Sequence, residues 1–172
     1  MRDPDTILNW RRIDARVTSS GQPTEPQLTD IARLGVRHVI NLGLHTHADA
    51  LPDEPGTVAG LGMNYIHIPV VFTAPSEADF DAFCAAYERT GDEPTHVHCI
   101  YNWRVSAFFY RYRRDVLGMA DAAARAHIDP IWCPHGVWAA FITPPPRPWS
   151  RAPAPGRAAA DRPVADPPRG RP

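Results

Sequence analysis

The scarcity of cysteine, of long apolar runs and of net charge in this sequence excludes several classes of protein. It contains only three cysteines, an odd number, which argues against a disulfide framework of the kind found in small secreted proteins. No apolar run reaches the length of a membrane span, and residues 1–5 carry acids and a proline where a secretory leader needs a basic start. The formal net charge of −1 provides no overall field toward nucleic acid or an anionic membrane. We therefore expect a cytoplasmic protein that binds neither nucleic acid nor membrane.

Proline, by contrast, is abundant and unevenly distributed. The chain of 172 residues has 20 prolines, and from Thr143 onward proline, arginine and alanine dominate. Such a composition buries too little apolar surface to offset the entropy of the chain. The sequence before it is long enough for one domain with its own core. We predict a folded domain over residues 1–142 and a disordered tail over residues 143–172, with the partner of the tail unknown.

Strand and helix patterns alternate along the predicted domain. Gly35 and Gly62 stand where helices are expected to end, and Thr24 and Ser76 have the spacing of capping boxes. The predicted helices cover residues 25–34, 55–61, 77–90, 105–116, 120–127 and 134–142, and the predicted strands cover residues 36–42, 63–70 and 95–98. This alternation indicates an α/β fold in three layers, with a mostly parallel central sheet and helices on both faces.

Two further interpretations concern single segments. Residues 18–23 have the composition of a turn, and they follow a short predicted strand. Cys84 lies on the apolar face of its predicted helix, which indicates packing rather than chemistry. In the last predicted helix, we expect Val137, Trp138 and Phe141 to face inward.

The stretch around Cys99 is the strongest candidate for chemistry. Residues 95–98 are predicted to form a short buried strand, Cys99 follows at its carboxyl end, and a loop closed by Arg104 leads into a helix. In sheets of this kind, ligands bind beyond the carboxyl ends of the strands. The positive end of a helix and a nearby arginine both favour the thiolate, which is the nucleophilic form of cysteine.

Each residue of this loop has an expected role. The Cys99 thiolate attacks an electrophilic phosphorus or sulfur, and the Arg104 guanidinium holds the oxyanion through two hydrogen bonds. Backbone N–H groups of the intervening residues bind the remaining oxygens, namely those of Ile100, Tyr101, Asn102 and Trp103. Ser106, or a water, orients groups within the loop, and His98 tethers the loop from the opposite face of its strand. The spacing alone leaves open a second interpretation, a strand-to-helix joint without chemistry.

Potential metal ligands gather in the loop of residues 43–56. His45, His47 and Asp49 lie close together there, and histidine and carboxylate are ordinary zinc ligands. A closed zinc site needs a fourth ligand at a defined spacing, and the sequence shows none. We predict a solvated polar loop, and we expect neither a metal nor a cofactor.

Taken together, these motifs resemble the bacterial beta-lactamase-hydrolase-like phosphatases, a branch of the tyrosine and dual-specificity phosphatase superfamily. The resemblance spans residues 7–142 and combines a Ser-Gly-Gln-Pro stretch with a His-Cys…Arg loop. Its matching segments are Val17–Thr24, Val39–Leu42, Tyr65–Val70, Val97–Cys99, Arg104–Phe108 and Ile131–Phe141. The resemblance implies a phosphatase-like (cysteine-phosphatase) fold over residues 1–142, with Cys99 as the nucleophile of a phosphocysteine intermediate and Arg104 as the oxyanion clamp.

The resemblance also implies a substrate, and the loop departs from the family pattern. The implied substrate is a phosphomonoester, phosphotyrosine being one type, in a phosphorylated small molecule or a phosphoprotein. Four residues instead of five separate Cys99 from Arg104, and none is glycine, so the left-handed turn is expected at Asn102. Loops of this length are similar to those of rhodanese-like sulfurtransferases, in which Cys99 would carry a persulfide. A pseudophosphatase that binds an anion or a partner is the third alternative.

The general acid is left unassigned by the sequence. Relatives in the superfamily supply an aspartate from a loop after an earlier strand, and the matching residues 70–79 have no aspartate directly after the strand. Asp79 has the position of a helix cap, and Glu77 is a distant candidate. Asp49 or Asp53 could reach in from the other loop.

Overall fold

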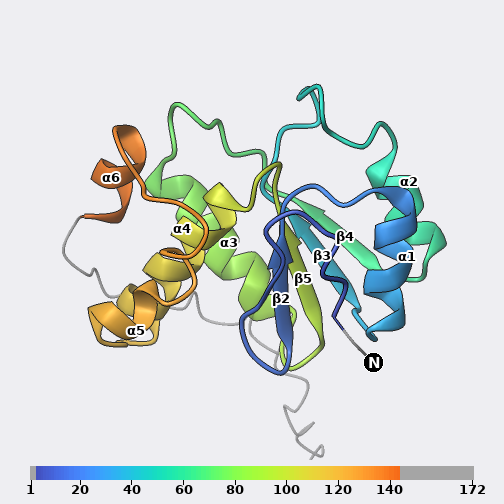
Figure 1. Ribbon diagram of the computed structural model, residues 1–172, viewed down its shortest axis with the longest axis horizontal. Helices are drawn as coiled ribbons and strands as arrows, with labels where there is room; N and C mark the ends of the chain where they lie inside the picture. The colour runs from blue at the N-terminus through green and yellow to red at the C-terminus, as the bar shows by residue number, and fades with distance from the viewer. Residues whose placement is uncertain (1–2, 144–172) are drawn as a thin grey trace, which may run out of the picture.

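A five-stranded sheet lies at the centre of the computed structural model, which describes residues 3–143 (Figure 1). Its order is β1-β2-β5-β3-β4; β1 runs antiparallel to β2, and the other pairs are parallel. The strands are β1 (Arg11–Arg12), β2 (Val17–Ser20), β3 (His38–Asn41), β4 (Asn64–His67) and β5 (Thr95–His98). β5 lies between β2 and β3 and is buried along its whole length, so the chain after it leaves from the middle of the sheet.

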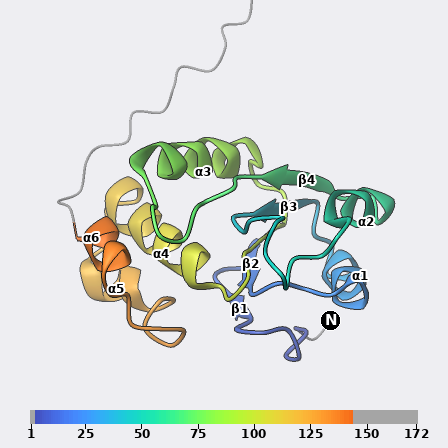
Figure 2. The same ribbon diagram turned by 90° about the horizontal axis from the view of Figure 1, so that it is seen from above.

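Helices cover both faces of this sheet, as Figures 1 and 2 show. One face carries α1 (Glu25–Arg33) and α2 (Glu54–Gly60). The other carries α3 (Glu77–Arg89), α4 (Trp103–Arg111), a π-helical turn (Tyr112–Val116), α5 (Asp121–Arg125) and α6 (Val137–Ile142). The predicted three-layer α/β architecture is therefore confirmed.

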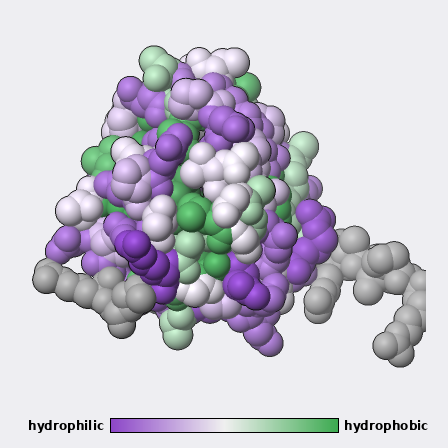
Figure 3. Space-filling model, turned by 90° about the vertical axis from the view of Figure 1, so that its right-hand side faces the viewer, coloured by the Kyte–Doolittle hydropathy of each residue, from purple (hydrophilic) through white to green (hydrophobic). Residues whose placement is uncertain are grey.

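Each face of the sheet has its own apolar cluster. The smaller cluster joins α1 and α2 to β3 through Leu28, Val58 and Val39. The larger one lies under α3, α4 and α6, and aromatic side chains such as Phe83 and Trp138 fill it. The outer surface over α1 and α2 is largely hydrophilic, with hydrophobic side chains gathered in a narrow central strip (Figure 3). Burial of one helix face and exposure of the other is the pattern expected of amphipathic helices on a sheet.

Capping residues and glycines in the sequence predicted the ends of several helices correctly. Thr24 and Ser76 cap α1 and α3 through capping boxes, as their spacing predicts. Gly35 and Gly62 follow α1 and α2 with positive φ angles of 85° and 76°, which glycine adopts without strain. The strands are shorter than predicted, because β3 and β4 each keep only four residues in the ladder. Cys84 is fully buried in the larger cluster, as expected.

The predicted turn at residues 18–23 is wrong in its first half. Thr18 to Ser20 belong to β2, which pairs with β5 and is buried. The hydroxyl groups of Thr18 and Ser20 tolerate burial because each forms a hydrogen bond with His96. One ring nitrogen lies 2.9 Å from Thr18 Oγ1 and the other 3.1 Å from Ser20 Oγ. Burial, and then the charge on His98, lowers the pKa of His96 well below its ordinary value. A neutral His96 therefore satisfies the polar residues of this strand.

Two predictions for the C-terminal helices also need correction. The predicted helix over residues 105–116 divides into α4 and the π-helical turn, and α5 and α6 are shorter than their predicted spans. Val137 is 47% exposed, whereas Trp138 and Phe141 are buried as predicted. Val137 opens α6, a helix of less than two turns, so only one side of it contacts the core.

The predicted tail over residues 143–172 lies outside the described residues, apart from Thr143. Within residues 3–143, no helix is both long and apolar enough to cross a membrane.

Candidate active site

Cys99 stands directly after β5, at the carboxyl end of the central strand, where the sequence places it. It is fully buried and belongs to the larger apolar cluster. Asn102 takes the left-handed conformation, with φ of 62°, as the absence of glycine predicts. Its side-chain amide donates hydrogen bonds to Asn9 O (2.7 Å) and Ser19 Oγ (3.1 Å). These bonds hold the turn in place, which offsets the strain of that backbone conformation.

The loop ends at an uncapped helix N-terminus. No side chain caps α4, and the first backbone bond of the helix runs from Ser106 N–H to Asn102 O (3.0 Å). The N–H groups of Trp103, Arg104 and Val105 precede that bond and have no partner in their own helix. Such groups and the helix dipole together attract an anion. The chain therefore brings the N-terminus of a helix, with its unpaired N–H groups, next to the thiol.

Arg104 is held in a fixed position beside this helix end. Its side chain is buried, and Nε donates a hydrogen bond to Val70 O (3.0 Å). The guanidinium carbon lies 5.1 Å from the centre of the Phe72 ring, in a cation–π contact. Because Nε is the guanidinium atom engaged by the backbone, the two Nη groups are the ones that can reach an oxyanion.

His98 lies on the opposite side of the strand end, where it meets a buried carboxylate. Its Nε2 is 2.8 Å from Oε1 of Glu54, and both side chains are almost completely buried. Glu54 also accepts hydrogen bonds from Asn41 Nδ2 (2.7 Å), Gln22 Nε2 (3.1 Å) and Tyr65 OH (3.1 Å). Burial alone would raise the pKa of Glu54, but the charge on His98 and these hydrogen bonds outweigh it and lower the pKa.

The structure thus places a buried carboxylate against His98, whose role as a tether of the loop stays a prediction. Glu54 is the residue of this network that sequence reasoning missed. Glu54 stands in the first turn of α2, where a carboxylate is ordinarily a surface residue that suits the helix dipole. Nothing in its neighbours along the chain indicates burial. Only the approach of β5 to the start of α2 brings it under the Cys99 loop.

Ser106 does not lie free within the loop. Its hydroxyl donates to Trp103 O (2.9 Å) and accepts from Trp132 Nε1 (3.0 Å). The Trp132 ring in turn stacks on Trp103, with centroids 5.1 Å apart and planes at 9°. Ser106 thus connects the first turn of α4 to the segment before α6.

A pocket of about 170 Å³ opens beside the loop. It is lined by His47, Phe72, Ile100, Tyr101, Trp103 and Arg104. Its wall is mostly aromatic, and Arg104 provides its positive charge. Four of the seven predicted site residues besides Cys99 therefore meet at one cavity, whereas Cys99 itself is not among the residues that line it.

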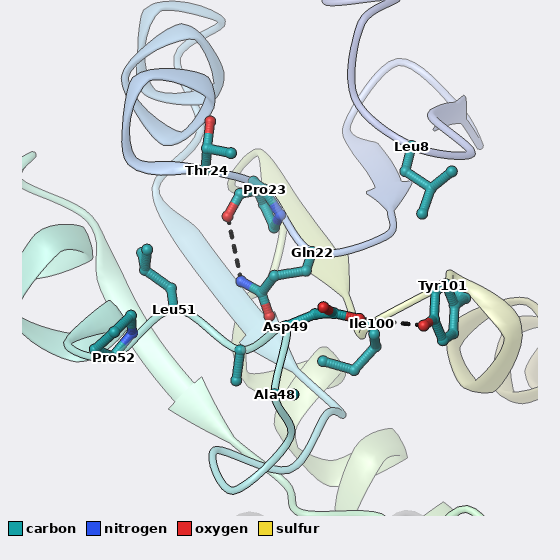
Figure 4. Close-up of a pocket in the computed structure, with 11 residues that line it drawn as sticks. Leu8, Gln22, Pro23, Thr24, Ala48, Asp49, Leu51, Pro52, Ile100 and Tyr101 are labelled. Atoms are coloured by element: carbon teal, nitrogen blue, oxygen red, sulfur yellow. Dashed lines mark hydrogen bonds between the residues drawn. The ribbon is translucent and has the colours of Figure 1, made fainter.

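A second pocket, of about 270 Å³, lies on the other side of Tyr101 (Figure 4). Its lining comes from the entry segment, the residues before α1, the loop before α2 and the Cys99 loop: Leu8, Gln22, Pro23, Thr24, Ala48, Asp49, Ala50, Leu51, Pro52, Ile100 and Tyr101. Tyr101 and Ile100 line both pockets, and Tyr101 OH donates a hydrogen bond to Asp49 Oδ2 (3.2 Å). The hydrogen bond and charge of Asp49 raise the pKa of Tyr101.

The carboxylates considered as general acids are mostly engaged elsewhere. Asp79 accepts from Ser76 N–H (2.9 Å) and Ser76 Oγ (2.7 Å), so it completes the cap of α3. Glu77 pairs with Arg111, and Asp53 caps α2 by accepting from Gly56 N–H. Asp49 alone among these four contacts the Cys99 loop. Among residues 3–143, no cluster of histidine, cysteine and carboxylate side chains has the arrangement of a metal site.

Comparison with protein families matches residues 6–130 to a family described as a DSP-PTPase phosphatase fused to NAD+ kinase. The chain belongs to this family. The predicted kinship with dual-specificity and tyrosine phosphatases is therefore confirmed.

Individual relatives support the same assignment. The beta-lactamase hydrolase-like protein of Xylella fastidiosa is 34% identical over 93 residues, which are 51% of this chain and 21% of that protein, so the match spans about a fifth of its length. A DUF442 phosphatase-group structure from Shewanella putrefaciens CN-32 is 33% identical, with a TM-score of 0.72 over 80% of this chain and 91% of its own. Pseudomonas aeruginosa TpbA, solved in complex with pTyr, is 18% identical, with a TM-score of 0.60 over 74% of this chain and 75% of its own. The last likeness shows the fold alone.

Proposed function

We propose that this chain is a cysteine-dependent phosphatase domain that hydrolyses a phosphomonoester. The observation that carries the proposal is the joint placement of Cys99, the uncapped N-terminus of α4 and the buried Arg104 at one strand end. These groups are a nucleophile and two sources of positive charge, which are what phosphoryl transfer asks of a protein. The family match favours this reaction over a rhodanese-like sulfur transfer.

The reaction would proceed in two displacements at phosphorus. The Cys99 thiolate forms an S–P bond while the P–O bond to the leaving group breaks, and the electron pair of that bond departs with the oxygen. Water then attacks the phosphocysteine, the S–P bond breaks, and its electron pair restores the thiolate. Through both steps the Nη groups of Arg104 and the N–H groups that begin α4 hold the equatorial oxygens.

The walls of the smaller pocket favour an aryl phosphate. Phe72, Tyr101 and Trp103 line it, and the centroids of the Tyr101 and Trp103 rings lie 5.3 Å apart. Aromatic side chains pack well against an aromatic substrate ring. The solved neighbour bound to pTyr supports the same class. We infer a phosphotyrosine-type substrate, on a phosphorylated small molecule or a phosphoprotein.

A second candidate function follows from the burial of Cys99. Its exposed fraction is 0%, and it lines neither pocket, so the sulfur has to be uncovered before a phosphate can reach it. A chain that kept the anion site without that movement would bind an anion or a partner and not hydrolyse it. This is the pseudophosphatase alternative.

Burst kinetics with p-nitrophenyl phosphate test the proposal. The unmodified chain should release one equivalent of p-nitrophenol rapidly and then turn over, and Cys99→Ser should abolish both phases. Cys133→Ser, which removes an exposed thiol far along the chain, is the matched control and should keep full activity.

Other outcomes decide against the proposal in different ways. Activity that survives in Cys99→Ser would exclude a phosphocysteine intermediate. No turnover of any aryl phosphate, together with phosphate binding that Arg104→Lys weakens, would establish the pseudophosphatase instead, because lysine lacks the fork that binds two oxygens.

A further inference from the structure

The proposed reaction needs a proton for the leaving oxygen. The loop between β4 and α3, where the resemblance places an acidic donor, contains no aspartate or glutamate. Between β4 and α3 the chain runs from residue 68 to residue 76 without a carboxylate. The next two acids are engaged in structure: Glu77 accepts from both Nη groups of Arg111 (2.6 and 3.0 Å), and Asp79 caps its own helix. The proton therefore has to come from another element.

The loop between β3 and α2 brings a histidine to the pocket instead. His47 lines the smaller pocket together with Arg104 and Phe72, and its side chain is 35% exposed. The imidazole stands with its edge against the Tyr101 ring, with centroids 6.2 Å apart and planes at 87°. The loop between β3 and α2 and the Cys99 loop lie at the same edge of the sheet (Figure 1). His47 provides the only imidazole among the residues that line this pocket, and imidazole is the side chain that most often serves as a general acid or base.

Asp49 determines which nitrogen of His47 faces the pocket. The backbone N–H of Asp49 donates to Nδ1 of His47 (3.1 Å), and the carboxylate Oδ2 lies 3.8 Å from the same nitrogen. Nδ1 is thus directed toward Asp49, and Nε2 is the nitrogen left for a ligand. In this arrangement Nδ1 is an acceptor, so the ring is neutral and carries its proton on Nε2. To act as an acid the ring takes up a second proton on Nδ1, and that N–H then exchanges the backbone N–H for the Asp49 carboxylate, whose Oδ2 is 3.8 Å away.

The neighbouring groups of the loop are less suited to the task. Asp49 lines the larger pocket, and its carboxylate is already engaged as the acceptor of the Tyr101 hydroxyl (Figure 4). His45 is hydrogen-bonded through Nε2 to Tyr65 OH (2.8 Å) and stacks on His67 with centroids 3.7 Å apart. Asp53 caps α2.

We propose that His47 is the general acid of this phosphatase, an inference that rests on the proposed function. As the S–P bond forms and the P–O bond breaks, the protonated imidazole transfers the proton on Nε2 to the departing oxygen, which leaves as a neutral phenol or alcohol. The neutral His47 then accepts a proton from the attacking water, which restores the imidazolium and releases inorganic phosphate. Asp49 is a positioning residue that holds the ring through Nδ1.

The dependence on the leaving group tests this role. Loss of a general acid changes the rate little when the leaving group is p-nitrophenolate, because this anion is stable without a proton. The rate falls much more when the leaving group is phenolate, which is a less stable anion. His47→Gln should lower kcat/KM for phenyl phosphate at least about 100-fold, while kcat/KM and the burst with p-nitrophenyl phosphate change little. The retained burst shows at the same time that the variant is folded. Asp49→Asn should cause a smaller loss with the same preference for phenyl phosphate.

His45→Gln is the matched control, because it removes a histidine from the same loop that does not line the pocket, and it should leave the ratio of the two kcat/KM values unchanged. An equal loss on both substrates in His47→Gln, or no loss on either, would overturn the assignment. If the unmodified chain hydrolyses neither substrate, it is the proposed function that fails, and the two failures are therefore distinguishable.

Discussion

Glu54 is a carboxylate without solvent contact, and its neighbours explain how it is tolerated. It faces His98 at the end of β5 and accepts hydrogen bonds from Gln22, Asn41 and Tyr65. Because His98 directly precedes Cys99, this contact lies at the strand end that carries the proposed nucleophile. A buried pair of this kind is costly to break, since the charge left behind has no partner.

The lowered pKa of Glu54 predicts an acid-sensitive contribution to stability. A carboxylate whose pKa is lower in the folded than in the unfolded chain stabilises the fold above the unfolded pKa, and this stabilisation is lost as the pH falls through the folded pKa. Glu54→Gln should reduce the free energy of unfolding at pH 7 by about 3 kcal/mol and flatten its decline in acid. Urea unfolding at a series of pH values measures both effects. Glu25→Gln, at the exposed start of α1, is the control and should keep the parental curve; a Glu54→Gln curve parallel to it would contradict the prediction.

At the scale of elements, α3 begins with a capping box that also bears on the chemistry. The Asp79 carboxylate accepts from the N–H and the hydroxyl of Ser76, and Ser76 Oγ accepts from Asp79 N–H (3.2 Å). Asp79 therefore belongs to the helix end and not to the pocket, although its position along the chain is near that of an acid loop.

Asp79→Ala separates these two roles. It should lower the free energy of unfolding by about 1 kcal/mol, because the cap is lost, and leave kcat/KM for phenyl phosphate unchanged. Thermal unfolding and steady-state kinetics on the same preparation provide the two values. A loss of activity confined to phenyl phosphate would instead identify Asp79 as the acid and displace His47.

At the scale of the whole molecule, the two apolar clusters share one sheet. β3 contributes Val39 to the smaller cluster and Ile40 to the larger, because successive side chains of a strand point to opposite faces. In the larger cluster, Phe83 meets the rings of Phe108 and Phe109 edge-on, with centroids 5.6 and 5.2 Å apart. Damage to either face should therefore weaken the sheet as a unit.

Core truncation on each side tests this coupling. Phe83→Ala should lower the free energy of unfolding by about 3–5 kcal/mol and Leu28→Ala by about 2–5 kcal/mol, since both side chains are completely buried. Each variant should still unfold in one transition, with tryptophan fluorescence and far-UV circular dichroism coinciding. Separate transitions for the two signals would show that the faces unfold independently.

The candidate site was predictable in part. The position of Cys99 at a strand end and the left-handed turn at Asn102 follow from neighbouring residues, because apolar patterning and backbone preference act over a few positions. The network beneath the site was not predictable in the same way. Glu54 and His98 are far apart along the chain. The residues next to each of them in the sequence favour exposure of the side chain and its burial equally.

The sequence by itself determined the alternation of strands and helices, the caps at Thr24 and Ser76, and the Cys99 loop between β5 and α4. These features depend on hydrogen bonds and apolar periodicity within single elements. Only the tertiary structure decided that residues 18–20 are a strand and that His47 lines the pocket beside Arg104. Polar side chains become buried or convergent only when partners distant in the chain satisfy them, and no local pattern records which partners those are.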